Sequence, residues 1–334
     1  MNFQGQHISN LIQFAALQGN AEGLMAKLEQ EGLPPGQLED GLDLSTYNYL
    51  ISEILSFTKD PFFGLHLGEH YGLSIASLVL QIVEEEQSLL DALTKLVHTL
   101  ELHWPSIPLE LEEQQKNLEV AFHISRRWFH QAPRVAQHTL DNLVLITLIA
   151  FHILTRGQLK PIRIHFAYNF PGYLKEYDRL FRVPVYFGKS QTTVYFEWNA
   201  EIQPPNKNDL ARLQSLVDQT QEEIQDLSHP KDFIQSIQYA VLNIINPNFP
   251  SIEQMAVHLN FSIRTLQRKL KQEHYTYKSL VDQMKREFAL KYLENPALDL
   301  RDIAYLLDYS ETRTFVRTFK RWENISPKDY RDRS

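Results

Sequence analysis

The spacing of apolar residues separates an N-terminal part with mixed periods from a C-terminal part with helical periods alone. Between Asp91 and Leu100 apolar residues recur every three or four positions, which predicts an amphipathic helix. The mostly apolar run from Val135 to Leu154 predicts a long core helix. Four β-rich runs predict strands at 118–124, 162–167, 183–187 and 192–196, with a hairpin joining the last two. Residues 1–203 are therefore expected to form an α+β domain that is mainly helical with a small sheet.

Pro204-Pro205 ends this domain, and the segment 204–230 that follows predicts a linker helix. Its apolar positions alternate spacings of three and four, as in a short heptad seam: Leu210, Leu213, Val217, Thr220, Ile224 and Leu227. Two interpretations stay open. The seam forms a homodimer contact, or the helix lies on its own domain, since fewer than three heptads are a weak coiled-coil signal.

From Lys231 to Ser334 the pattern is helical throughout, which predicts an all-α domain. The expected helices are 231–245, 251–259, 262–272, 277–293, 299–307 and 311–322, with a short turn after Ser326. The long helix 277–293 is expected to join two similar halves.

Those halves superpose at an offset of 48 residues, so that Ala256 matches Ala304 and Leu259 matches Leu307. The small alanine allows two helices to cross closely, and the leucine ends the first helix of each half. Asn260 and Asp308 follow, and these residue types tolerate the left-handed conformation that a sharp turn needs. Ser262 and Ser310 are then expected to cap the second helices.

Each half thus has the pattern of a helix-turn-helix unit, whose second helix turns polar side chains outward to read a DNA major groove. A helical bundle with solvated faces is the alternative, and two units in tandem disfavour it. The candidate DNA-contacting residues are Ser262, Arg264, Thr265, Gln267, Arg268, Lys271, Ser310, Thr312, Arg313, Thr314, Arg317, Lys320 and Arg321.

Charge is distributed unevenly along the chain, whose formal net charge is −8. Residues 231–334 contain 17 Lys+Arg and 13 Asp+Glu, a net +4, which leaves −12 on the remainder. A slightly basic C-terminal domain permits DNA binding without requiring it. The N-terminus has no signal-peptide pattern, and the run Leu143–Leu154 is too short to span a membrane, so we expect a cytoplasmic protein without membrane contact.

The C-terminal region resembles the DNA-binding domain of the AraC/XylS family of bacterial transcription regulators. The residues that carry the resemblance are Leu259–Leu270, Ile303-Ala304, Asp308–Glu311, Phe315–Trp322 and Ile325–Arg331. It implies that Ser262–Lys271 and Glu311–Arg321 enter successive major-groove segments of double-stranded promoter DNA, about one turn (~34 Å) apart. It also implies RNA polymerase as a partner. The family commonly has glycine at Asn260, Asp308 and Asn324, and arginine at Lys285.

The N-terminal domain resembles the arabinose-binding-type effector domain of one branch of this family. The resemblance rests on Gly64–Gly68, Ser88–His98 and Pro161–Phe187, and implies control by a small-molecule effector of unspecified identity. Two polar-aromatic clusters are candidates for lining an effector pocket, with core packing as the alternative. The candidate residues are His103, Trp104, Arg126, Arg127 and Trp128.

Enzymatic motifs are not found: the sequence contains neither a Gly-rich phosphate loop, nor His-Glu-x-x-His, nor Gly-x-Ser-x-Gly. It contains no cysteine, and His123, His130 and His138 lack the spacing of metal ligands. We therefore expect no cofactor, no metal site and no catalytic residue. The function predicted is an effector-controlled transcription regulator, and the alternative is an N-terminal enzyme or protein-interaction module that the DNA-binding domain places on DNA.

Overall fold

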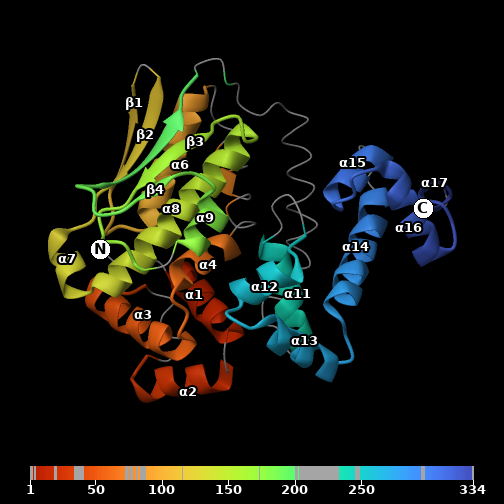
Figure 1. The fold of residues 1–334 in the computed structure, drawn as a ribbon, viewed down its shortest axis with the longest axis horizontal. Coiled ribbons are helices and arrows are strands. Elements are labelled where there is room, and N and C mark those ends of the chain that lie inside the picture. The colour runs from red at the N-terminus through yellow and green to blue at the C-terminus, as the bar shows by residue number, and fades with distance from the viewer. Residues whose placement is uncertain are drawn as a thin grey trace. The chain divides into compact units, whose positions relative to one another are not determined.

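The computed structural model describes residues 3, 5–18, 21–33, 41–71, 88–114, 116–172, 174–199, 233–244, 249–294 and 298–332, with a few single positions between 72 and 87 and at 202. The chain divides into two compact units, Met1–Lys207 and Asn208–Ser334 (Figure 1). The heptad-like segment 204–230 lies outside the described residues.

Unit 1 contains one five-stranded sheet and eight described helices. The helices are α1 (Gly5–Leu17), α2 (Ala21–Gln30), α3 (Leu44–Thr58), α4 (Phe63–His70), α6 (Leu89–His103), α7 (Arg126–Gln131), α8 (Pro133–Thr155) and α9 (Lys175–Phe181). The strands are β1 (Leu109–Glu113), β2 (Asn117–Phe122), β3 (Pro161–His165), β4 (Val185–Tyr186) and β5 (Thr192–Glu197). Their order is β1-β2-β5-β3-β4, and every neighbouring pair is antiparallel except β3 with β4.

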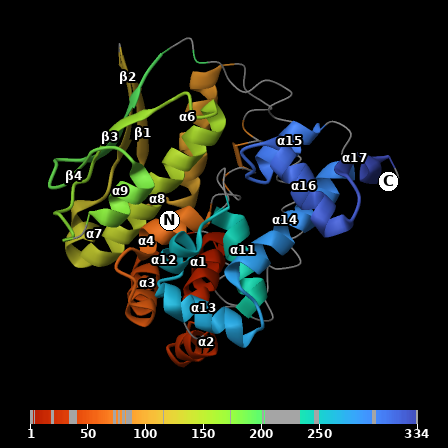
Figure 2. The same ribbon diagram turned by 45° about the vertical axis from the view of Figure 1, so that its right-hand side comes forward.

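The sheet buries one face because its strands alternate apolar and polar side chains. Val120 of β2 and Val194 of β5 are fully buried, and the Phe196 ring lies 5.0 Å from the Phe151 ring of α8. Figures 1 and 2 show α8 running along this side of the sheet. The opposite face carries polar and charged side chains, among them Glu119.

The predicted core helix and strands are confirmed. The prediction of the sheet is wrong about the hairpin and misses one strand. The expected hairpin does not form, because β4 pairs with β3 in parallel rather than with β5. Beyond β4, the backbone N–H groups of Gly188 and Lys189 donate to the carbonyls of Tyr168 and Phe166, which keeps the chain beside the end of β3. The structure also adds β1, whose Leu-Glu-Leu-Glu-Glu sequence is poor in strand-forming residues.

Two glycines one helical turn apart let α4 cross α8 closely. A Cβ on Gly64 would lie 2.0 Å from the carbonyl oxygen of His138, and one on Gly68 would lie 3.1 Å from the carbonyl oxygen of Asn142. The backbone N–H of Gly64 also donates to Nδ1 of His138 at 3.2 Å. The segment Gly64–Gly68 is thus part of the core of unit 1.

Helix α8 is the one helix among the described residues with the length and mean hydropathy to span a membrane. Most of that stretch is buried inside unit 1, as in the core helix of a globular protein. Its buried Asp141 has partners within the unit: the carboxylate accepts hydrogen bonds from the hydroxyls of Tyr168 and Tyr177, and burial raises the Asp141 pKa to about 7.

A buried chain of ionisable groups ties α4 to α9. The His66 ring donates through Nδ1 to Asp60 at 2.6 Å and through Nε2 to Glu176 at 3.2 Å. Arg179 continues the chain from Glu176 to Glu69, where it makes two hydrogen bonds of 2.8 Å. Although burial opposes the charged ring, the two carboxylates raise the His66 pKa to about 9.

The regular secondary structure of unit 2 is all helical in the described residues. Its helices are α11 (Phe233–Ile244), α12 (Ile252–His258), α13 (Ile263–Gln272), α14 (Tyr277–Glu294), α15 (Leu300–Leu306), α16 (Thr312–Glu323) and α17 (Pro327–Arg331). Every helix predicted between 231 and 334 is present, with its ends within two residues of the expected positions.

Candidate nucleic-acid interface

Helices α12 and α13 form a first helix pair with a tight turn. The side chain of Ser251 caps α12 in a capping box with Gln254. Asn260 adopts a φ of 53°, which reverses the chain, and the N–H of Phe261 donates to the carbonyl of Ala256 at 2.7 Å. Ser262 then caps α13 by accepting from the N–H of Thr265, as predicted.

Helices α15 and α16 form a second helix pair with the same turn. Asp308 has a φ of 61°, and the N–H of Tyr309 donates to the carbonyl of Ala304 at 2.8 Å. The predicted cap by Ser310 is wrong: Glu311 occupies the N-cap position of α16, and its side chain makes no capping hydrogen bond. Helix α16 therefore begins one residue later than the repeat predicts.

This extra residue changes the offset between the two pairs from 48 before the turn to 49 after it. The buried Leu266 and Leu270 of α13 then correspond to Phe315 and Phe319 of α16. The exposed cations follow the same offset: Arg264 with Arg313, Arg268 with Arg317, and Lys271 with Lys320. Both helices thus bury one stripe and present cations three or four positions apart on an exposed face.

Eleven of the thirteen candidate DNA-contacting side chains are exposed, and Thr265 and Thr312 are half-buried. On α13 the remaining cation, Lys269, points instead toward the rings of Phe233 and Phe261, at 5.1 and 5.4 Å from their centroids. Lys269 is therefore engaged in packing, whereas Arg264 and Arg268 extend into solvent.

Lys285 of α14 links the two helix pairs. Its Nζ lies 4.7 Å from the ring centroid of Phe249, which precedes α12, and 4.9 Å from that of Tyr309, in the turn of the second pair. Burial lowers the Lys285 pKa, while Asp308 and Asp282 act in the opposite direction. Sequence reasoning did not place Lys285 in the site, although its position in α14 was singled out as one where AraC/XylS regulators commonly have arginine.

The five candidate effector-contacting residues of unit 1 do not converge on one described hollow. The rings of Trp104 and Trp128 are buried in the core, whereas Arg126 and Arg127 are exposed. His103 is half-buried and bonds through Nδ1 to the carbonyl of Thr99.

A buried row of aromatic rings nevertheless connects the two clusters. The Trp128 ring lies 6.3 Å from Phe3, which stacks on Tyr47 at 3.7 Å. His7 continues the row to Trp104 at 4.9 Å, and neither His7 Nε2 nor Trp104 Nε1 has a hydrogen-bond partner among the described residues. Burial lowers the His7 pKa to about 3, so this ring is neutral.

Comparison with protein families identifies both units. Residues 24–200 match the arabinose-binding domain of AraC transcription regulator, N-term. The chain belongs to the family of AraC-type transcription regulators. In this AraC-type regulator, residues 255–333 match a helix-turn-helix domain, and that range contains α13 to α17.

Among curated relatives, the ornithine utilization regulator of Pseudomonas aeruginosa is 29% identical over 180 residues, which cover 52% of this AraC-type regulator and 51% of the relative. The chain thus matches about half the length of that relative. The regulator VirS of Mycobacterium tuberculosis is 40% identical over 81 residues, 24% of each chain. Among solved structures, the transcriptional regulator CdpR from Pseudomonas aeruginosa matches with a TM-score of 0.37 and 23% identity, covering 92% of this chain and 96% of that chain.

Proposed function

We propose that this AraC-type regulator binds double-stranded promoter DNA through two helix-turn-helix units, α12–α13 and α15–α16, under the control of a small-molecule effector bound by unit 1. In this proposal residues 1–203 sense the effector, 204–230 link the domains, and 231–334 bind DNA.

The observation that carries the proposal is the repetition of three exposed cations, from α13 to α16, at the offset of 49 residues that also relates the buried Leu and Phe positions. In a helical bundle with merely solvated faces, exposed cations would not be expected to repeat at the same offset as the buried apolar positions. Arg264 and Arg313, near the N-termini of the two helices, are placed to reach bases or phosphates, because helix-turn-helix proteins present this end to the major groove. The same residue types, with Gln267 and Thr314, suit base edges and phosphates.

The test is a gel-shift measurement on a duplex selected from random sequences by the full chain, at ~150 mM salt. We expect Arg268→Ala and Arg317→Ala each to weaken binding about 10- to 100-fold, because one lost base contact costs ~1–3 kcal/mol. A phosphate-contacting arginine would instead lower the salt slope by about one.

The matched control is Lys116→Ala, which removes an exposed cation in the turn between β1 and β2 of unit 1. Its affinity should stay within about two-fold of that of the original protein. If Arg268→Ala and Arg317→Ala also bind the selected duplex unchanged, the two helices do not read DNA and the proposal fails.

The match of unit 1 to the arabinose-binding domain of AraC regulators supports the effector control in this proposal. Ligand binding would shift the population of DNA-competent states by its difference in affinity for them. The five candidates around Trp104 and Trp128 remain proposed effector contacts, and a homodimer through 204–230, contact with RNA polymerase and action in the cytoplasm are further parts of the proposal. No observation on the described residues favours catalysis by unit 1.

A further inference from the structure

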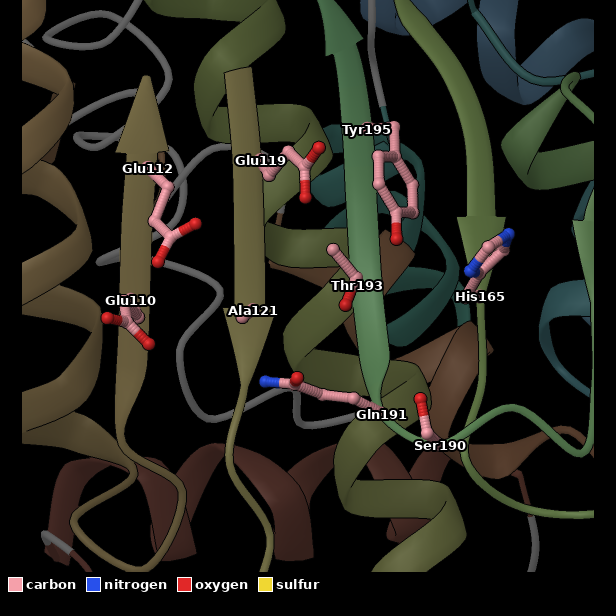
Figure 3. A pocket seen from close by; sticks show the side chains of 9 residues that line it. All are labelled: Glu110, Glu112, Glu119, Ala121, His165, Ser190, Gln191, Thr193 and Tyr195. Atoms are coloured by element: carbon pink, nitrogen blue, oxygen red, sulfur yellow. The ribbon is translucent and has the colours of Figure 1, made fainter. Parts of the chain in front are cut away.

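The open face of the sheet in unit 1 contains a polar hollow of about 160 Å³ (Figure 3). Its lining comes from β1, β2, β5 and β3 and from the residues just before β5. This volume lies below the ~300 Å³ at which sites for drug-sized ligands begin, so the hollow suits a small metabolite.

The register of the strands explains why the hollow exists. One cross-strand row places Glu110, Ala121, Thr193 and His165 opposite one another on β1, β2, β5 and β3. The two central residues are small, so they form a floor between the longer side chains at either end. In Figure 3 their side chains lie between those of Glu110 and His165.

The neighbouring row places two carboxylates directly opposite each other. Glu112 of β1 pairs in register with Glu119 of β2, followed by Tyr195 of β5. Neither glutamate has an ion-pair or hydrogen-bond partner among the described residues. Like charges directly opposite in a sheet destabilise it, so this arrangement is unfavourable until a positive charge lies between them.

Thr193 supplies a second, independent sign of a ligand. The residue is 6% exposed, and it lines the hollow. No hydrogen bond to its hydroxyl is found among the described residues, in contrast to its neighbour Thr192, whose Oγ1 accepts from the N–H of Ala167. Because Thr193 lines the hollow, its hydroxyl is available to hydrogen-bond a ligand group there.

The far end of the hollow presents the His165 ring, with two cations nearby. Burial lowers the pKa of His165, and the nearby Arg163 and Lys189 lower it further, so the ring is uncharged at neutral pH. The guanidinium of Arg163 lies 3.9 Å from the Tyr195 ring centroid and occupies one face of that ring. A ligand therefore meets carboxylates at one end and hydrogen-bonding groups at the other.

We propose that this hollow binds a small organic cation, with an ammonium group between Glu112 and Glu119 and a hydroxyl or amine on Thr193 and His165. A metal ion fits less well, because no group of three or more ionisable side chains among the described residues converges in metal-binding geometry. The proposal deepens the proposed function, since it names a chemical class for the effector of unit 1, and it rests on that function.

The test is saturation-transfer NMR on the full chain with four-carbon probes that differ only at their ends. We expect 4-amino-1-butanol and 1,4-diaminobutane to bind at least 10-fold more tightly than 1,4-butanediol and 4-hydroxybutanoate. Glu119→Gln should weaken binding of the two amines about 10-fold or more, because a charged hydrogen bond is lost. Thr193→Val should weaken binding of 4-amino-1-butanol several-fold.

The matched control is Glu197→Gln, which removes one carboxylate from the same face of β5, outside the hollow. It should leave amine binding within two-fold. Glu119→Gln should also keep or raise the melting temperature, since it relieves the repulsion with Glu112. Equal binding of the diol and the amino alcohol, or unchanged amine binding by Glu119→Gln, would overturn the proposal.

Gel shifts with and without 1,4-diaminobutane separate this inference from the proposed function. If the amine binds through Glu119 and leaves DNA affinity unchanged, the hollow is a cation site and effector control through it fails. If no amine binds while Arg268→Ala still loses DNA affinity, the cation site is wrong and the DNA-binding function stands.

Discussion

Gly64 lies against the backbone carbonyl of His138 so closely that a Cβ at this position would be 2.0 Å from the carbonyl oxygen. The Gly64 N–H also donates to the His138 ring, so one residue makes two contacts between α4 and α8. The backbone of α4 at Gly64 lies against the backbone of α8 at His138, and backbone cannot move aside as a flexible side chain would. This crossing sets the distance between the two helices and makes glycine a requirement of the fold.

The first prediction is that Gly64→Ala destabilises unit 1 by about 3 kcal/mol or more, because the helices must separate to admit a methyl group. Gly68→Ala is the matched variant. Its nearest contact, at 3.1 Å, is longer, and alanine is ~1 kcal/mol better than glycine in a helix, so a change within about 1 kcal/mol is expected. Urea unfolding followed by tryptophan fluorescence measures both, since three of the four tryptophans lie in unit 1. Equal effects of the two substitutions would contradict the close crossing at Gly64.

The second prediction concerns alkaline pH. The His66 pKa is about 9 in the folded chain and about 6.5 in an unfolded one, so the folded state holds the proton more tightly. Its contribution is fully present below pH 6.5 and is lost as pH rises through 9. The free energy of unfolding should therefore fall between pH 6.5 and 9.5, by up to roughly 3 kcal/mol. His66→Gln should flatten this fall, whereas the exposed His98→Gln should keep it.

The third prediction concerns Asp141, whose folded pKa of about 7 lies above its unfolded value of 3.8. The folded state binds the extra proton, so stability from this group is present below pH 3.8 and lost as pH rises through 7. Asp141→Asn removes the buried charge and keeps polar atoms facing Tyr168 and Tyr177. Relative to the original protein, the free energy of unfolding of the variant should increase as pH rises from 4 to 8, by on the order of 1–4 kcal/mol. If the difference in stability between the two proteins does not change with pH, the pKa of Asp141 is not raised in the folded state.

The fourth prediction concerns Lys285, whose ammonium faces the rings of Phe249 and Tyr309. Lys285→Met should destabilise unit 2 by about 1 kcal/mol, because each cation–π contact is worth ~0.5–1 kcal/mol and burial of the charge offsets part of it. Lys285→Arg should retain most of the stability. Lys278→Met, at an exposed position of the same helix, is the control in thermal unfolding. If it lowers the melting temperature as much as Lys285→Met does, the ring contacts of Lys285 are not stabilising.

The helices of unit 2 and the turns of its repeat could be predicted from sequence because their causes are local. The 3.6-residue period of buried positions, the serine cap at Ser262 and the left-handed Asn260 and Asp308 depend on neighbours within a few residues. The predicted cap at Ser310 is wrong for an equally local reason. One additional residue precedes α16, so Glu311 is its N-cap and Thr312 its first residue. The thirteen candidate DNA contacts follow from the same local pattern, and their role awaits the gel-shift test.

The sequence alone therefore determined which segments are helical, where they turn and which faces are polar. Only the tertiary structure decided what depends on residues far apart in the chain. The pairing of β4 with β3, the close approach of Gly64 to His138 and the alignment of Glu112 with Glu119 all join segments that local pattern leaves unconnected. Strand register is set by packing of the whole sheet on α8, and a one-residue shift of β1 or β2 would turn the glutamate of that strand to the other face.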